Sequence, residues 1–277
     1  MRNLLMAVMA FAFLTELNAQ QMAIPRSSPK STVTQTVGIT DLSISYSRPG
    51  VKGREIWGKL VPYNEVWRTG ANENTTITFS YTVKIEGTKL APGTYGLQTI
   101  PGADEWAVIL SKDAKLWGAF NYKPENDALR FKVKPQAGDF TERMQFTFAD
   151  ITDNSAVVVL QWEKVKVAFK VEVETQALVL AKARAAIGWQ ATMQAANYCL
   201  ENDINLDEAM KWIDISISIK ENYSNVRVKA MLLAKFNKMP DAIKTMEKAI
   251  QFAKGLPEPP FNLKVTEDML AEWKKKK

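Results

Sequence analysis

Residues 77–85 read Ile-Thr-Phe-Ser-Tyr-Thr-Val-Lys-Ile, and residues 165–173 read Val-Lys-Val-Ala-Phe-Lys-Val-Glu-Val. In both stretches every second residue is apolar and most of the residues between them are polar. Side chains of a β-strand point alternately to the two faces of its sheet, so this period of two buries one face and leaves the other polar. The two stretches therefore predict strands that each cover one side of a hydrophobic core.

Similar segments fill the chain from residue 32 to residue 174, and turn-forming residues such as Pro92-Gly93 and Pro101-Gly102 stand between them. The further strand candidates are residues 33–46, 94–100, 106–111, 128–134, 143–150 and 155–162. Eight or nine short strands without an intervening helical pattern are typical of an antiparallel sandwich or barrel. We predict a closed antiparallel β-sandwich.

After residue 176 the apolar residues follow a helical period, with candidate helices at 185–200, 206–220, 225–237, 240–254 and 264–274. Asn205 and Pro240 stand where an N-cap and a first-turn proline would stand. Ala209 and Ala242 begin similar patterns 33 residues apart, close to the 34-residue repeat of tetratricopeptide arrays. The segment resembles such repeats weakly, since the characteristic helix A residues are not matched, and a plain helical bundle packed on the sandwich fits as well. The predicted fold class is α+β.

The first 19 residues combine Arg2, an apolar run from Leu4 to Leu14, and Leu17-Asn18-Ala19 before a cleavage position. The apolar run has eleven residues, too few to span a bilayer, which is typical of a secretory signal peptide. The predicted organisation is a signal peptide at 1–19, a β-sandwich domain at 20–175 and a helical domain at 176–277. We expect an exported protein, periplasmic or extracellular, with no transmembrane segment after signal cleavage.

The composition excludes several classes of chemistry. The chain has no His and one Cys, so His-based nucleophilic catalysis, His-ligated metals and an intrachain disulfide are all excluded. The net charge of +6 owes much to Lys274–Lys277 at the end of an otherwise balanced chain, which argues against nucleic-acid binding. We expect no metal and no cofactor.

Residues 46–76 form a connection between two predicted strands that is much longer than a hairpin needs. The connection contains Trp57, Tyr63 and Trp67, together with Ile56 and Leu60, which is too much apolar bulk for a disordered segment. We therefore expect an ordered loop that crosses one edge or one end of the sandwich.

Arginine, asparagine and glutamate side chains accompany these aromatic residues. Guanidinium groups offer planar sets of donors for carboxylate, phosphate or sugar hydroxyl groups, and tryptophan and tyrosine offer flat apolar faces. The loop is thus a candidate ligand site, and the candidate residues are Arg48, Lys52, Arg54, Tyr63, Glu65, Trp67, Arg68, Asn72 and Glu73. In the alternative interpretation, Arg–Glu pairs and buried tryptophans attach the loop to its own scaffold.

Several motifs in this region are specific: Tyr46–Arg54, Val61–Tyr63, Glu65–Glu73, Thr99–Gly102 and, further on, Trp117-Gly118. Over residues 26–174 the chain resembles a family of exported bacterial proteins classed as a domain of unknown function. Asn64 stands where that family usually has Gly, a mild departure because Asn also tolerates a left-handed turn. The resemblance implies export and a β-rich module; it implies no activity and no catalytic residues.

Three functions fit these features. In the leading hypothesis the protein is a non-catalytic module that binds a polar ligand, a glycan or another envelope component, through the Arg/Trp loop, while the helices contact a protein partner. A second is a carboxylate-based, glycosidase-like hydrolase that uses two of Glu55, Glu65 and Glu73 as acid and base. The third is a structural assembly adaptor built on the methionine-rich helices.

Overall fold

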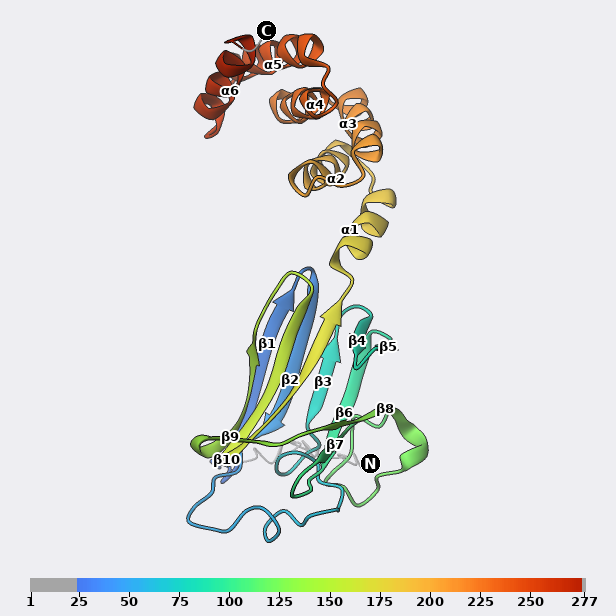
Figure 1. Ribbon diagram of the computed structural model, residues 1–277, viewed down its shortest axis with the longest axis vertical. Helices are drawn as coiled ribbons and strands as arrows, with labels where there is room; N and C mark the ends of the chain where they lie inside the picture. The colour runs from blue at the N-terminus through green and yellow to red at the C-terminus, as the bar shows by residue number, and fades with distance from the viewer. Residues whose placement is uncertain (1–23, 276–277) are drawn as a thin grey trace, which may run out of the picture.

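The computed structural model describes residues 24–275, so the predicted signal peptide lies outside the described residues. Ten strands of this part form two antiparallel sheets, and six α-helices follow them (Figure 1). The α+β class, the antiparallel sheets and the C-terminal helical segment predicted from the sequence are confirmed. In strand order, the six-stranded sheet consists of β1 (Lys30–Val37), β2 (Thr40–Ser47), β3 (Thr76–Phe79), β6 (Gly93–Ile100), β7 (Trp106–Ser111) and β8 (Asp127–Val133). The four-stranded sheet consists of β5 (Thr88–Leu90), β4 (Val83–Ile85), β10 (Ser155–Val173) and β9 (Gln136–Ala149).

The two sheets share one hydrophobic core. Ile77 and Phe79 of β3 and Val83 and Ile85 of β4 all belong to it and are almost completely buried. The apparent single strand at 77–85 is nevertheless two strands in different sheets. After Ser80, whose backbone N–H donates to Asp41 O of β2, the chain passes from the six-stranded to the four-stranded sheet. A period of two cannot reveal such a crossing, since both sheets face the same core.

Two other strand boundaries differ from the sequence prediction. The 33–46 candidate is a hairpin, in which β1 and β2 pair around a two-residue turn at Gly38-Ile39. The candidates 155–162 and 165–173 form one long strand, β10, with register shifts around Glu163, whose φ of 54° is left-handed. A bulge of this kind adds a residue on one strand and shifts which face the following side chains occupy.

Four tryptophans hold the long loop on the end of the sandwich. Trp57 and Trp67 of the loop meet Trp106 of β7 and Trp162 of β10, with ring centroids 4.9–6.5 Å apart. Each such aromatic contact contributes about 0.5–1.5 kcal/mol beyond its buried area. The loop is therefore ordered, and Figure 1 shows it at the end of the sheets farthest from the helices.

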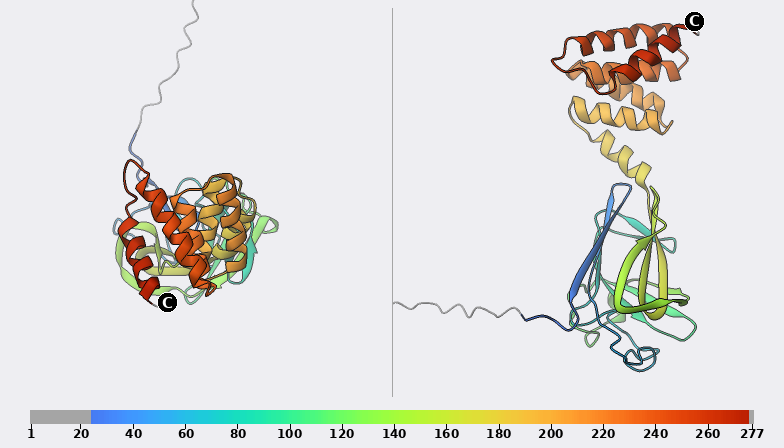
Figure 2. Two further views of the ribbon diagram at one scale, coloured as in Figure 1. Left: turned by 90° about the horizontal axis from the view of Figure 1, so that it is seen from above. Right: turned by 90° about the vertical axis from the view of Figure 1, so that its left-hand side faces the viewer.

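The helices are α1 (Thr175–Arg184), α2 (Trp189–Glu201), α3 (Leu206–Ile219), α4 (Tyr223–Lys235), α5 (Met239–Lys254) and α6 (Leu263–Lys275). They stack beyond the end of the sheets at which β10 ends (Figure 2). The candidate helix at 185–200 was wrong in its start: α1 precedes it, and the chain turns at Gly188, where φ is 100°. Asn205 occupies the N-cap position of α3, as predicted, with left-handed backbone and without a capping hydrogen bond from its side chain.

Ala209 of α3 and Ala242 of α5 are both completely buried, as are Ile213 and Met246 four residues further on. The 33-residue spacing of similar patterns in the sequence thus corresponds to equivalent core positions of two helices. Whether these helices are true tetratricopeptide repeats stays a prediction.

Several contacts stabilise the junction between β10 and α1. Thr175 Oγ1 donates to Asp153 O, and the carboxylate of Glu174 pairs with Lys84 Nζ at 2.5 Å. A Cβ on Gly38 would lie 2.1 Å from Thr175 Oγ1, so the β1–β2 turn packs directly on the first residue of α1. The first helix is therefore attached to both sheets. Within residues 24–275, no helix has both the length and the apolarity needed to cross a bilayer.

Candidate functional site

Two of the predicted ligand-binding arginines bind the protein's own backbone. Arg48 Nε donates to Met144 O of β9 at 2.9 Å. Arg54 donates from Nε to Val51 O at 3.1 Å and from Nη2 to Gly50 O at 2.6 Å. These two guanidinium groups are structural parts of the loop and do not converge on an open cleft.

The most exposed of the predicted residues lie along the surface of the loop. Lys52 and Glu65 are exposed and form no salt bridge with any described residue. Tyr63, 39% exposed, lies over Gly58, where a Cβ would come 2.9 Å from its ring. None of the three lines the pocket described below.

Trp67 and Arg68 lie deeper. Trp67 belongs to the tryptophan cluster, and its indole N–H donates to Gly70 O at 3.1 Å. Arg68 is half-buried, and desolvation lowers its pKa; its Nε is buried and donates to no described residue. Its Nη1 lies beside Gly118, at which a Cβ would be 3.6 Å away. Arg68 is thus a partly desolvated cation that lies against the segment 112–123, which is part of the connection between β7 and β8.

Asn72 and Glu73 close the loop against the chain that precedes β1. Asn72 Nδ2 donates to Ser28 O at 3.4 Å. Glu73 Oε1 accepts from Arg26 Nη1 at 2.7 Å, and Glu73 Oε2 accepts from Ser47 Oγ at 3.4 Å. The hydrogen bond from Arg26 holds the pKa of Glu73 below its ordinary value. Of the nine predicted residues, only Glu73 lines the pocket.

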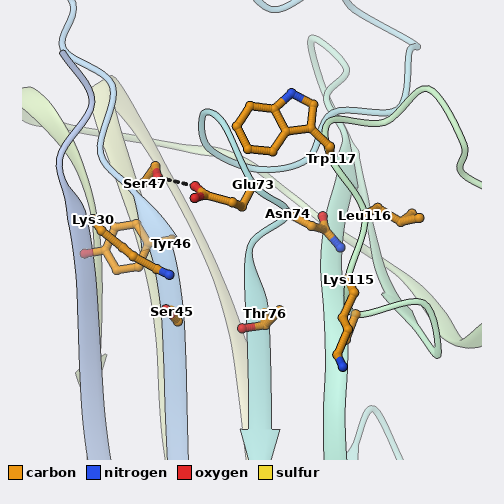
Figure 3. Close-up of a pocket in the computed structure, with 11 residues that line it drawn as sticks. Lys30, Ser45, Tyr46, Ser47, Glu73, Asn74, Thr76, Lys115, Leu116 and Trp117 are labelled. Carbon is orange, nitrogen blue, oxygen red and sulfur yellow. Dashed lines mark hydrogen bonds between the residues drawn. The ribbon is translucent and has the colours of Figure 1, made fainter. Parts of the chain in front are cut away.

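The pocket has a volume of about 330 Å³ and lies on the outer face of the six-stranded sheet, at the end away from the helices (Figure 3). Ser45 and Ser47 of β2 and Thr76 of β3 supply hydroxyl groups to its floor, because they alternate with the core residues of those strands. Lys30 of β1 forms one wall, and residues 114–117 form the opposite wall. The pocket is therefore lined mainly by polar groups.

Asn74 is the most deeply buried polar side chain of this pocket that carries an unused hydrogen-bonding atom. Its exposed fraction is 6%; Nδ2 donates to Asp113 O at 3.3 Å, and Oδ1 accepts no hydrogen bond from the described residues. Extension of the β3–β6 register beyond Thr76–Gly96 places Asn74 opposite Gln98, which is completely buried and has both amide atoms without a partner. An unpaired buried polar atom costs about 1–3 kcal/mol.

Trp117 lies at the mouth of the pocket and is 63% exposed. Its backbone forms a bridge with Glu73, and Leu116 O accepts from the backbone N–H of Asn74 at 3.0 Å. Figure 3 shows the indole ring beside the Glu73 carboxylate. The backbone of the tryptophan is thus fixed while its side chain remains accessible.

Comparison with known families places this geometry in a context. A model of the family described as "Protein of unknown function (DUF2911)" matches residues 28–171, just over half of the chain. The chain belongs to this family. The matched DUF2911 region contains the pocket from Lys30 to Trp117, and the helices lie outside it. Comparisons with curated proteins and with solved structures each found no match.

The lining of the DUF2911 pocket is suited to binding a polar molecule. Glu73 is its one carboxylate, and no three side chains of residues 24–275 gather as metal ligands. Lys30, Asn74 and Lys115 are not among the ligand-binding residues predicted from the sequence, because they meet only in the folded chain. For Trp117 the sequence held a usable signal, a large aromatic residue followed by glycine in a connection between strands. In the structure Gly118 has a left-handed φ of 69°.

Proposed function

We propose that the protein is an exported, non-catalytic binding module whose sheet domain recognises a carbohydrate in the pocket beside Trp117. The observation that carries this proposal is the presence of an accessible indole ring, Trp117, and a carboxylate, Glu73, in one polar pocket. An indole face stacks on the C–H face of a sugar ring, while amide and carboxylate oxygens accept hydrogen bonds from its hydroxyl groups.

The size of the pocket supports a small ligand or one unit of a longer chain. A volume of about 330 Å³ stands at the lower end of the range of about 300–1,000 Å³ that is usual for ligand pockets. The pocket is open on the outer face of the sheet, so a polymer can place one residue in it and continue past Trp117. Export would bring such a site to the envelope or the cell exterior, where polysaccharides occur.

The single carboxylate supports binding over hydrolysis. A glycosidase of the two-carboxylate kind needs an acid and a base about 5–10 Å apart across the bond that breaks. Glu73 lines the pocket and is paired with Arg26, whereas Glu55 and Glu65 are exposed on the loop and do not line it.

Retention of the full chain on a panel of neutral and acidic polysaccharides tests the proposal. We expect retention on at least one polysaccharide, and at least a tenfold weaker affinity after Trp117→Ala. Phe120→Ala is the matched control, since Phe120 is 87% exposed in the same segment but does not line the pocket. Binding to none of the polysaccharides, or equal binding by the Trp117→Ala variant, would refute the proposal.

A second candidate function is that of an assembly adaptor, with the helices contacting a protein partner. It is favoured by Phe261, completely exposed in the connection before α6, and by Leu256, 48% exposed nearby. A partner isolated from envelope extract with the full chain should bind the purified protein and lose binding to the Phe261→Ser variant. Undiminished binding to that variant would remove this surface from consideration.

A further inference from the structure

The charges around the pocket do not cancel. Glu73 is neutralised by Arg26, whose Nη1 lies 2.7 Å from Glu73 Oε1. Lys30 and Lys115 also line the pocket, and neither pairs with a carboxylate of any described residue. Arg26, Lys30 and Lys115 thus outnumber the one acidic side chain of the pocket, and Arg26 together with Lys30 helps to lower the pKa of Glu73.

The two lysines come from opposite sides of the pocket. Lys30 belongs to β1 and Lys115 to the segment 112–123, with β2 and β3 between them. Figure 3 shows the Lys30 side chain extending from β1 over β2, and the hydroxyl group of Thr76 lying on the floor between the two lysines. Ammonium and hydroxyl groups at this end can all donate hydrogen bonds.

Hydrogen-bond acceptors occupy the other end. There, Glu73 presents its carboxylate, whereas the unpartnered Oδ1 of Asn74 is buried. The pocket thus has a donor end and an acceptor end, with the ring of Trp117 beside the acceptor end. A ligand that matches both ends carries hydroxyl groups on one part and an anionic group on the other.

We propose that the carbohydrate is an acidic one, a uronic acid unit whose carboxylate lies between Lys30 and Lys115. Its hydroxyl groups would then donate to Glu73 while its ring faces Trp117. Two charge-assisted hydrogen bonds to a carboxylate are shorter and stronger than those to a neutral hydroxyl group, so the lysines would determine which sugar binds. This inference rests on the proposed carbohydrate binding and specifies its ligand.

Affinity electrophoresis of the full chain tests the inference with four polyuronates: pectate, alginate, hyaluronan and a glucuronan. Each is compared with its carboxyl-reduced form, in which the same polymer lacks the charge. We expect retention by at least one native polyuronate and at least tenfold weaker retention by its reduced form. The Lys30→Ala/Lys115→Ala variant should lose at least tenfold on the native polymer and bind the reduced form as the wild type does.

A Lys112→Ala/Lys123→Ala variant is the control, because it removes the same charge from exposed lysines of the same segment that do not line the pocket. Equal losses in the two double variants would show unspecific attraction of a basic protein to polyanions, and would overturn the inference. Retention on neutral polysaccharides alone would overturn the inference and leave the proposed function intact. A chain that binds no saccharide at all would refute both.

Discussion

Replacement of Arg48 by Ala tests whether the arginines of the long loop serve the scaffold or a ligand. The guanidinium group of Arg48 is part-buried, and its Nε donates to Met144 O at 2.9 Å, which joins the loop to β9. A hydrogen bond to a charged group contributes about 1.5–3 kcal/mol, and its removal leaves a carbonyl oxygen of a buried residue without this donor. We expect Arg48→Ala to lower the free energy of unfolding by about 1.5–3 kcal/mol.

Urea unfolding, followed by tryptophan fluorescence and by circular dichroism, measures this difference from the shift of the midpoint at an unchanged slope. Lys52→Ala is the matched control: it removes the same charge four residues away, from an exposed side chain that makes no side-chain hydrogen bond among the described residues. That variant should remain within about 0.5 kcal/mol of the wild type. Saccharide retention by folded Arg48→Ala protein should equal that of the wild type.

The opposite pattern would refute this reasoning. If Arg48→Ala unfolds at the wild-type urea concentration and loses saccharide binding, the guanidinium group contacts the ligand. The loop would then be the binding surface, as the sequence alone suggested.

Three further predictions concern other parts of the molecule. Gly38→Ala should lower the free energy of unfolding by at least about 2 kcal/mol, because a left-handed alanine is strained and its Cβ would collide with Thr175. Gly87 has a left-handed φ of 76° and open space around it, so Gly87→Ala should cost clearly less in the same urea unfolding experiment. Equal costs would contradict the close packing at Gly38. Glu73→Gln should destabilise the protein by under about 1 kcal/mol at neutral pH. The pKa of Glu73 is lowered in the folded chain, so its contribution to stability is present above the ordinary carboxyl pKa of about 4.5 and is lost as the pH falls through the folded value. The free energies of unfolding of wild type and Glu73→Gln, measured against pH, should therefore converge in acid. A difference that stays constant with pH would refute this origin. Cys199 is completely buried, and desolvation raises the pKa of its thiol, so it should react with a thiol reagent at neutral pH only after unfolding; rapid labelling of the native protein would contradict this burial.

The sequence predicted the fold class because the two periods of apolar residues are physical requirements of a strand and a helix. What it could not reveal was which sheet each strand joins. Val83 and Ile85 continue the alternation of β3 in phase, yet they belong to the other sheet. The helical pattern was recognised from Ala177 onward, but helix α1 was not separated from the helix that follows it, because the apolar residues continue through the turn at Gly188, with Ile187 before it and Trp189 after it.

The site was harder to predict than the fold. Arg48 and Arg54 have the composition of a ligand site, but their partners are backbone carbonyls, which every residue possesses and no pattern reveals. The pocket residues Lys30, Glu73 and Lys115 are separated by more than 40 residues from one to the next, and only strand pairing brings them together. Glu73, the one predicted residue that lines the pocket, lies at the end of the loop, next to β3.

The most direct test of the central claim is a titration of the full chain with the saccharide that retains it, observed through the indole N–H resonances of the eight tryptophans. Trp117→Phe and single replacements elsewhere assign the resonances. The account predicts that the Trp117 resonance shifts with saturation, while those of the clustered tryptophans at positions 57, 67, 106 and 162 stay in place. Shifts confined to the cluster at Trp67, with Trp117 unchanged, would contradict it and return the binding site to the arginine loop.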